Sequence, residues 1–499
     1  MTAVQEPGLS FAAPAGRWVL TATVLGSGMA GLDATVVGIA LPAIGREFGV
    51  GVEALQWVST AYTLTLAGLL LLGGTLGDRF GRRRVFLVGV VWFGVASALC
   101  GVAPTSLTLI LARGLQGVGA ALLTPGSLAI LQASFTEDDR GRAIGAWSGL
   151  GGVATAIGPF VGGWLIAAVS WRLVFYLNLP LTVAVVLITA RHVPESRAPG
   201  AHGRLDVTGA VLVTAGLSAL SYGLIEGQAF GWTSPPILAC LAAGAVLLAA
   251  VVPVERRAAD PLLPPALFRS VQFSAANGVT FVVYAALGGA LFLLPVVLQT
   301  VAGYSPLVAG TALLPVTAIM LLLSSRSGAL AARIGPRLQM TVGPLVIAAG
   351  LLLLMRIGVG SGYATDVLPA MLVFGLGLAI NVAPLTATAM AAAPAEHAGV
   401  ASAVNNDVAR AAGLIAVAVL PALAGINGET YLRPEELAGG FRTAVLISAI
   451  ACAVGGILAA ATIRNPARRP AAADRLAHEL HCALEGPPLR TTTRSTTTQ

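Results

Sequence analysis

Long runs of apolar residues follow one another along almost the whole chain, and short polar or glycine-rich stretches separate them. Strand-like alternation of apolar and polar residues is absent from these runs. As α-helices, runs of this length cross a hydrocarbon core of roughly 30 Å. The pattern predicts an all-α polytopic membrane protein with fourteen spans, at residues 18–41, 54–74, 85–103, 107–131, 142–167, 172–191, 207–226, 235–254, 272–298, 307–328, 339–358, 365–392, 403–424 and 441–463.

Charge is scarce and unevenly placed. Only 10% of the residues are charged, against about one quarter in a soluble domain. All 29 basic residues are arginine, and the lack of lysine is typical of a GC-rich bacterial coding sequence. With fourteen spans, 22 arginines fall on the side that carries both termini, and the opposite side receives Arg46, Arg172, Arg356, Arg433 and Arg442. Because cytoplasmic loops are rich in arginine, both termini are expected to be cytoplasmic. A basic chain can also indicate nucleic-acid binding, but topology explains these arginines, and no nucleic-acid partner is expected.

One loop sequence occurs twice. GTLGDRFGRRR, Gly74 to Arg84, joins spans 2 and 3, and GALAARIGPRL, Gly328 to Leu338, joins spans 10 and 11. Five positions match at one offset of 254, and Ala332 stands where Asp78 is expected. Two glycine and arginine turns could match by chance. The shared offset favours a duplicated helical bundle, as in many transporters.

The repeat divides the chain into two six-helix bundles, 18–191 and 272–463, with two inserted helices at 207–254. Polar segments 192–206 and 255–271 are rich in proline and arginine and are expected to be cytoplasmic linkers. Residues 1–17 form a cytoplasmic N-terminal segment. The low-complexity tail, 464–499, is expected to be disordered, apart from a short helix near residues 473–484.

Asp33 is the strongest candidate for chemistry, because it lies midway along the otherwise uncharged first span. A carboxylate at this depth is expected to face the bundle interior or a wet cavity. Apolar surroundings favour the neutral form until water or a cation arrives. Asp33 is therefore a candidate proton carrier, or a counter-charge for a cationic substrate. The plain structural alternative is a neutral carboxyl bonded to a neighbouring helix.

Arg113 is the second candidate and lies in span 4, about two turns from its outer end. It either extends its charged head to the interface or acts as a fixed cation near Asp33. In span 5, Gly158 and Gly162 form a small-xxx-small surface beside Pro159 and Gly163. That surface either flexes between the halves or packs statically.

Other polar residues lie in later parts of the membrane region. Asp407 and Arg410 are three residues apart in span 13 and are expected to pair on one helical face. Gln116, Asn381 and Asn405 either line a cavity or make helix–helix hydrogen bonds.

Several classes of function are disfavoured. A Walker loop requires lysine, so ATP-driven pumping by this chain is not expected. The four cysteines form no CxxC pair, which argues against a zinc site or a disulfide framework. Neither a metal, a cofactor nor an enzymatic activity is expected.

These motifs together resemble the major facilitator superfamily, in particular its fourteen-helix drug:proton antiporters. The resemblance covers almost all of residues 18–463 and rests on the loop motif with LDATVVGIALP, ARGLQGVGAA, IGPFVGG, WRLVFYLNLP, LPVVLQ, GYSPLVAG and HAGVASAVNNDVARAAG. It implies a major-facilitator fold of two six-helix bundles plus two inserted helices.

The resemblance also implies roles for individual residues. Asp33 matches the acid of proton coupling, and Arg113 matches the arginine linked to it. Gly158 and Pro159, followed by Gly162 and Gly163, match the antiporter motif. The conformational latch matches Gly74, Asp78, Arg79, Gly81, Arg82 and Arg83. Gly38 and Ala154 depart from the usual Asn and Gly, and span 10 lacks the acid that some multidrug members carry, which weakens the case for dicationic substrates.

The resulting hypothesis is proton-driven export by alternating access, in which Asp33 lies between the bundles and meets water from either side. The expected partners are a lipophilic or cationic small molecule, protons as coupling ion and the lipid bilayer, and the protein is expected to act as a monomer. One alternative is a dedicated exporter of an endogenous metabolite or self-made antibiotic. Another is a membrane scaffold or sensor that does not transport.

Overall fold

The computed structural model describes residues 8–197, 205–258, 261–394 and 398–465. Nearly all of the tail expected to be disordered, and its short helix, lie outside the described residues. Within them, fourteen helical spans are long and apolar enough to cross a membrane, as predicted. They are formed by α1 (Pro14–Phe48), α2 (Val52–Phe80), α3 (Arg82–Gly101), α4 (Ser106–Ser134), α5 (Glu137–Ala168), α6 with α7 (Leu173–Tyr176, Asn178–His192), α8 (Val207–Phe230), α9 (Pro235–Arg257), α10 (Val271–Thr300), α11 with α12 (Pro306–Thr311, Leu314–Ile334), α13 (Pro336–Leu354), η2 with α14 (Tyr363–Val367, Leu368–Ala391), α15 (Ala398–Leu423) and α16 (Pro434–Thr462).

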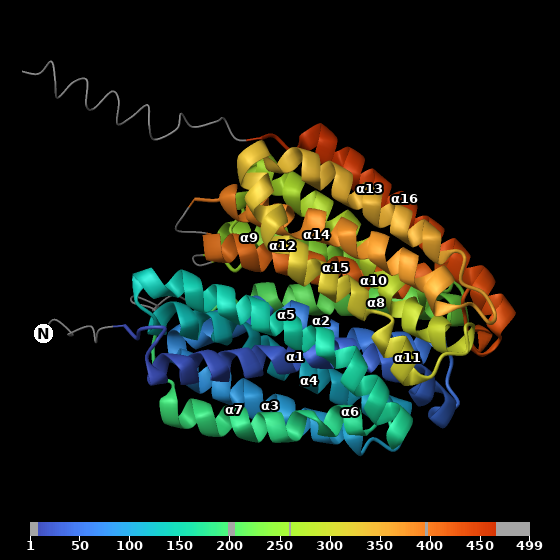
Figure 1. Ribbon diagram of the computed structural model, residues 1–499, viewed down its shortest axis with the longest axis horizontal. Coiled ribbons are helices and arrows are strands. Elements are labelled where there is room, and N and C mark those ends of the chain that lie inside the picture. Colours follow the sequence, from blue (N-terminus) through green and yellow to red (C-terminus); the bar gives the residue numbers. More distant parts are fainter. Residues whose placement is uncertain (1–7, 198–204, 259–260, 395–397, 466–499) are drawn as a thin grey trace, which may run out of the picture.

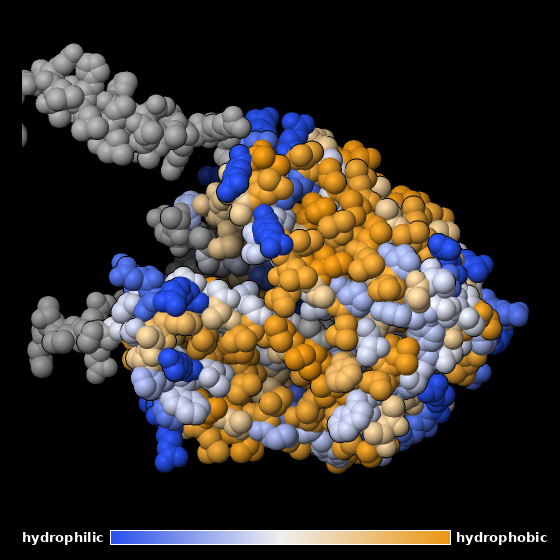
Figure 2. Space-filling model, viewed as in Figure 1, coloured by the Kyte–Doolittle hydropathy of each residue, from blue (hydrophilic) through white to orange (hydrophobic). Residues whose placement is uncertain are grey.

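The helices form two groups that lie one above the other in Figure 1. Helices α1 to α7 form the lower group, and α10 and α12 to α16 form the upper group. The short helix α11 reaches across and packs on α5. The inserted hairpin of α8 and α9 contacts α2 of the first group and α15 of the second. Apolar side chains cover the middle of the visible face, and charged side chains gather at its two ends (Figure 2), as expected for a protein surrounded by lipid.

The two copies of the loop motif make the same contacts. Gly81 and Gly335 both adopt positive φ, +114° and +87°, where each chain turns from one helix into the next. Arg83 then donates through Nη2 to the carbonyl of Ala190, 2.5 Å, at the end of α7. Arg337 donates through Nη2 to Ala460, 2.6 Å, at the end of α16. The likeness of the halves thus extends from the sequence to contacts with the last helix of each.

A second pair of contacts repeats beside these arginines. The Glu195 carboxylate accepts from the backbone N–H of Arg83, 3.0 Å. Asn465 Oδ1 accepts from the backbone N–H of Arg337, also 3.0 Å. Each side chain thus supplies an acceptor at the start of a helix whose first N–H groups have no partner within the helix.

The two groups of helices are joined at the end away from these loops, which we call the arginine-poor end. There Tyr431 donates to the carbonyl of Val50, 2.9 Å, and Glu53 accepts from the N–H of Gly428, 2.8 Å. Burial raises the pKa of Tyr431, so its hydroxyl remains a donor at neutral pH.

Further bonds at this end join the membrane-spanning parts of the two groups. Gln56 donates to Val417, 2.6 Å, and Gln299 donates to Ile39, 2.9 Å. Toward the arginine-rich end, α5 faces open space, since a Cβ added at Gly145 or Gly149 would meet no atom within 4 Å. The molecule is therefore closed at its arginine-poor end.

Candidate functional site

Asp33 of α1 and Arg113 of α4 form a buried ion pair. Their Oδ2 and Nη1 atoms lie 2.5 Å apart, and the two residues are 0% and 1% exposed. Arg113 therefore does not extend to the membrane interface, which was one of the two interpretations of its position. Its Nε donates to the carbonyl of Val58, 3.2 Å. A buried charge is tolerated only when it is paired and hydrogen-bonded, and both conditions are met here.

Two side-chain amides complete the shell around the carboxylate. Gln116 donates to Asp33 Oδ1, 2.8 Å, and Asn178 donates to the same oxygen, 3.1 Å. The Gln116 carbonyl accepts from Arg113, 2.6 Å. Ser97 accepts from both amides and donates to the carbonyl of Phe175, 2.8 Å. The arrangement stabilises an ionised carboxylate beside a guanidinium, with four helices holding the partners.

The position of Asp33 differs from the expectation that it lies between the two bundles. Its hydrogen-bond partners all come from α4 and α7, so the carboxylate lies inside the first group of helices. The physical reason is that a carboxylate within the membrane needs hydrogen-bond donors in place of water. Arg113 and the two amides supply these donors, and all three belong to neighbouring helices of the same group. Water can reach Asp33 only after this packing loosens.

Tyr62 of α2 connects the ion pair to a cavity. Its ring centroid lies 4.4 Å from Cζ of Arg113, within the range of a cation–π contact, and its hydroxyl donates to Ala30. Tyr62 also lines a cavity of about 250 Å³ between the two groups of helices, which we call the central cavity. A single aromatic side chain thus contacts both the buried charge and the space where a small molecule could lie.

The central cavity offers unused hydrogen-bond donors. Nε1 of Trp147, on α5, and Nε of Arg410, on α15, are buried without a hydrogen-bond partner. Ser27, Ser148 and Thr155 add hydroxyl groups to the lining, which includes no carboxylate among the described residues. Because unpaired buried donors are unfavourable, this lining suits a molecule that presents acceptors.

The antiporter-motif glycines of α5 pack closely against both halves. A Cβ on Gly158 or Gly162 would collide with side chains of Thr35 and Val36 on α1, and one on Gly163 would collide with the backbone of Pro306 on α11. A Cβ on Gly310 would collide in turn with the carbonyl of Pro159. Helix α5 continues through Pro159. The motif therefore forms a close contact between the halves at the arginine-poor end.

The first loop motif contacts its own half. Asp78 pairs with Arg82, 2.7 Å, and Arg82 also donates to the carbonyl of Ala129 on α4. The Arg79 guanidinium lies 5.5 Å from the ring centroid of Phe80. A Cβ on Gly74 would be in ordinary contact with Pro125 of α4, 3.6 Å away. These contacts attach the loop to α4, and the expected latch remains a prediction.

The expected ion pair between Asp407 and Arg410 is wrong. Within the described part of the chain no salt bridge joins them, and Asp407 Oδ1 and Arg410 Nε are both buried without a hydrogen-bond partner. Arg410 lines the central cavity, whereas Asp407 lines a separate cavity beside the inserted hairpin. Helix α15 separates these two spaces, so a shared spacing on the helix did not bring the charges together.

The three amides singled out from the sequence have different surroundings. Gln116 belongs to the ion-pair shell. Asn405 donates to Asn277 and Thr280 of α10, so it makes a helix–helix contact. Asn381 is fully buried, and neither of its side-chain polar atoms has a hydrogen-bond partner.

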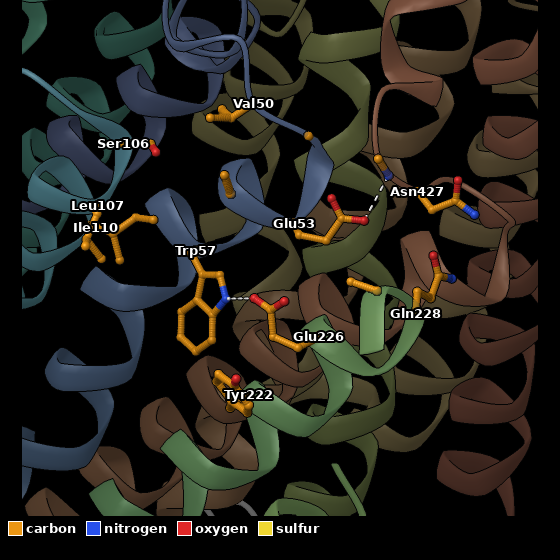
Figure 3. A pocket seen from close by; sticks show the side chains of 14 residues that line it. Val50, Glu53, Trp57, Ser106, Leu107, Ile110, Tyr222, Glu226, Gln228 and Asn427 are labelled. Carbon is orange, nitrogen blue, oxygen red and sulfur yellow. Dashed lines mark hydrogen bonds between the residues drawn. The ribbon is translucent and has the colours of Figure 1, made fainter. Parts of the chain in front are cut away.

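A larger pocket of about 890 Å³ lies at the arginine-poor end (Figure 3). Trp57 donates from its indole to Glu226, 2.9 Å, and Tyr222 stands beside it, with ring centroids 6.3 Å apart. Glu53, which also lines this pocket, accepts a hydrogen bond from the backbone N–H of Gly428. Since Glu226 has a partner on α2, it attaches the inserted helix α8 to the first group.

Three residues of the site were missed by sequence reasoning: Tyr62, Ser97 and Asn178. Asn178 falls within WRLVFYLNLP, so its motif carried a signal, but its position gave no role. Tyr62 and Ser97 occur in apolar runs where most such residues only pack. No group of three or more potential metal ligands occurs within the described segments.

Sequence comparison identifies close relatives. A sequence model described as the Major Facilitator Superfamily matches residues 23–418. The chain is 39% identical over 407 residues to "Multidrug resistance protein Stp" of Mycobacterium tuberculosis, covering 80% of this chain and 74% of that protein. It is 40% identical over 414 residues to a puromycin resistance protein of Streptomyces alboniger, covering 81% and 80%. A "Tetracenomycin C resistance and export protein" of Streptomyces glaucescens is 37% identical, covering 81% and 75%.

Comparison with solved structures finds the same fold in known transporters. A crystal structure of a peptide transporter in complex with sulfate matches with a TM-score of 0.66 at 15% identity, covering 92% of this chain and 96% of that one. A D-xylose–proton symporter matches with a TM-score of 0.63 at 16% identity, covering 90% and 98%. These likenesses concern the fold alone. With the family model matching most of the chain, the repeated loops and the fourteen spans, the chain belongs to the Major Facilitator Superfamily.

Proposed function

We propose that the protein is a proton-coupled antiporter that exports drug-like or antibiotic small molecules across the bacterial cytoplasmic membrane by alternating access. The observation that carries the proposal is the buried pair of Asp33 and Arg113, which contacts the central cavity through Tyr62. The names of the relatives, which refer to multidrug resistance and to antibiotic resistance and export, support this class of activity. The activity is transport and involves no chemical conversion or cofactor beyond the proton.

The orientation follows from the arginines. Most of them lie at the end that carries the Gly74–Arg84 loop, so we place this end and both termini in the cytoplasm. We accordingly propose that the closed, arginine-poor end faces outward, which makes this conformation inward-facing. The moving bodies are the bundles 18–191 and 272–463. Since one chain supplies both bundles, a monomer is sufficient for transport.

Coupling is proposed to occur at the ion pair. In this state Arg113 and two amides hold the ionised Asp33 away from water. Protonation of Asp33 would leave the Arg113 guanidinium buried without its counter-charge, which destabilises the packing by about 3–5 kcal/mol. The outward-facing state is therefore the one in which Asp33 binds a proton. Each charge moved across 100 mV supplies about 2.3 kcal/mol.

The central cavity favours one class of cargo. Its unused donors on Trp147 and Arg410 come from opposite halves, so one molecule with acceptor atoms can bond to both. We therefore propose neutral or anionic aromatic compounds rich in oxygen for this cavity, ahead of cationic cargo. Relatives named for tetracenomycin C export and as a probable actinorhodin transporter support export of a self-made antibiotic as the second candidate.

Transport by the purified protein in liposomes tests the proposal. Vesicles with an imposed pH gradient are supplied with puromycin, tetracenomycin C or ethidium, and uptake is compared with that of empty vesicles. Uphill accumulation of at least one compound that collapses when a protonophore is added is expected. No gradient-dependent movement of any compound, from protein that is folded and correctly inserted, would favour a scaffold or sensor.

A further inference from the structure

A groove of about 620 Å³ runs between α3, α4 and α7 on the lipid-facing side of the first group of helices. All of its lining residues are apolar, and most of them lie on α3 between Leu87 and Leu99. That stretch of helix is about 18 Å long, a little more than the roughly 15 Å of hydrocarbon in one leaflet. The groove therefore has the length and the chemistry to hold one acyl chain.

Trp92 forms a rigid part of this groove. Its side chain is 44% exposed, and its Nε1 donates to the carbonyl of Leu115 on α4, 2.8 Å. Because the indole N–H is already bonded, the ring offers only hydrocarbon surface to the groove. Tryptophan in membrane proteins is enriched at the two interfaces, whereas Trp92 lies about midway along α3. A fixed aromatic surface at this depth suits contact with a hydrocarbon chain.

Two arginines stand at the arginine-rich end of the groove. Arg83 and Arg84 each lie four residues, about one helical turn, before an apolar residue of the lining, so they continue its face of α3. Arg83 reaches across to α7, where it donates to the carbonyl of Ala190, 2.5 Å. The side chain of Arg84 is 71% exposed. One arginine thus bridges the mouth of the groove, and the other extends beside it.

The acid beside these arginines is already engaged. Glu195 accepts from the backbone N–H groups of Arg83 and Arg84, 3.0 and 3.2 Å, at the start of α3. It approaches the Arg84 guanidinium only to 3.7 Å, and such surface pairs contribute about 0–1 kcal/mol. Two guanidinium groups and one carboxylate leave the mouth of the groove positively charged. The exposed guanidinium of Arg84 is therefore available to a second anion.

The second half of the molecule lacks this combination. At the offset of 254, Leu338 stands in place of Arg84. Val346 likewise stands in place of Trp92. The neighbouring loop arginine, in contrast, is repeated together with its contact to the last helix of its bundle. The repeated architecture thus requires neither the second arginine nor the tryptophan, which favours a ligand as the reason for both.

We propose that this groove binds an anionic phospholipid, with one acyl chain along α3 over Trp92 and the phosphate at Arg83 and Arg84. Basic pockets between membrane helices bind anionic headgroups in this way. A zwitterionic phospholipid offers the same chain without the net charge, so the positive mouth favours the anionic one. The site lies on the outside of one bundle, away from the central cavity, and the proposal does not depend on transport.

Native mass spectrometry tests the proposal. The full-length protein, freed of lipid in detergent, is titrated with phosphatidylglycerol and, separately, with phosphatidylethanolamine carrying the same chains. The first phosphatidylglycerol is expected to bind at least tenfold more tightly than the first phosphatidylethanolamine. A phosphatidylglycerol with a diazirine on one acyl chain then reports the location, and its crosslinks are expected on α3, α4 and α7 around the groove.

Variants separate the headgroup from the chain. Arg84→Gln is expected to remove most of the preference for phosphatidylglycerol. Val95→Trp fills the groove from a position that is 58% exposed, and it is expected to weaken phosphatidylglycerol binding at least tenfold with both arginines in place. Arg142→Gln is the matched control and should bind like the parent, because Arg142 is 70% exposed and forms a similar surface pair with Asp139 at 3.8 Å.

Four results would each overturn the proposal. One is equal affinity of the parent protein for the two lipids. Another is parent-like binding of phosphatidylglycerol by both Arg84→Gln and Val95→Trp. A third is crosslinks spread evenly over the lipid-facing surface. The last is a dimer that only Val95→Trp dissociates, which would assign the groove to a second copy of the chain.

Discussion

Tyr62 contacts both the guanidinium of Arg113, at 4.4 Å from its ring centroid, and the central cavity. The ion pair and the cavity are thus separated by the thickness of one side chain. Cargo or water in the cavity can influence the pair by moving this ring. Tyr62 is therefore the residue through which occupancy of the cavity and protonation of Asp33 are expected to influence each other.

The first prediction concerns that ring. Tyr62→Phe keeps the contact with Arg113 and loses only the bond to Ala30, so near-normal transport is expected. Tyr62→Leu removes the aromatic face and admits water to the pair, and transport should fall at least tenfold. Cys100 provides a direct readout, because it is fully buried with its Sγ 3.6 Å from Gln116 Oε1.

The accessibility of Cys100 is measured by alkylation in protein whose other cysteines are replaced by serine. A large increase in rate is expected for Tyr62→Leu, whereas Tyr62→Phe should match the parent. Equal rates in all three proteins would show that Tyr62 does not shield the ion pair.

The second prediction concerns cargo. Replacing Arg410 by Gln or Trp147 by Phe removes one of the unpartnered donors in the central cavity. A hydrogen bond to a charged group contributes about 1.5–3 kcal/mol, so Arg410→Gln should weaken binding of an acceptor-rich cargo by roughly 10- to 100-fold. Trp147→Phe should have a smaller effect.

Arg442→Gln serves as the control for the loss of an arginine, because Arg442 is exposed and bonds to the carbonyl of Met355 away from the cavity. Isothermal titration with the cargo identified in the flux assay measures the affinities. Stronger binding after Arg410→Gln would contradict the assignment of the cavity to acceptor-bearing molecules.

The third prediction concerns the contact at the arginine-poor end. Gly163→Val and Gly310→Val place side chains against the backbone of Pro306 and Pro159, so the halves cannot close there. We expect both variants to be held open at that end and to lose at least 90% of transport. Gly145→Val is the control on the same helix as Gly163, since its Cβ would meet nothing within 4 Å.

Spin labels on the exposed positions Val169 and Leu432 report the separation of the halves at that end. The distance between the two labels, measured by double electron–electron resonance, should lengthen in Gly163→Val and stay unchanged in Gly145→Val. A distribution identical to the parent in all variants would exclude this role for the glycines.

The fourth prediction uses the internal repeat. Arg83→Ala and Arg337→Ala each remove a bond between a loop arginine and the end of its own bundle, so each should lower stability by about 1 kcal/mol. Arg84 is a suitable comparison, because its 3.7 Å pair with Glu195 has a side chain that is 71% exposed, and such surface pairs contribute about 0–1 kcal/mol. Thermal unfolding in detergent orders the three variants. Loss of stability at only one of the two matched arginines would argue against equivalent halves.

The spans and the repeat were readable from the sequence because lipid requires each crossing helix to be apolar along its whole length. Charges inside such runs stand out, which is why Asp33 and Arg113 were found. The sequence did not show whether each charged side chain would face the interior of its own bundle or the space between the bundles. Neighbouring helices determine this. Asp33 does face a bundle interior, as expected, but its expected place between the two bundles and the expected pairing of Asp407 with Arg410 were wrong.

Residues of ordinary polarity were harder to find. Ser97 and Asn178 acquire their role only because α3 and α7 bring them to the same carboxylate. Tyr62 resembles any core aromatic until its contact with Arg113 is seen. Sequence spacing within one helix carries no information on such contacts between helices.

The account depends most on Asp33 as the site where proton movement is linked to cargo movement. The most direct test compares, for one cargo in the same liposomes, uphill transport driven by a pH gradient with exchange at equal pH. In the Asp33→Asn variant we predict loss of at least 95% of uphill transport, while equal-pH exchange of labelled for unlabelled cargo continues at a measurable rate. Uphill accumulation by Asp33→Asn at the parent rate would contradict the account.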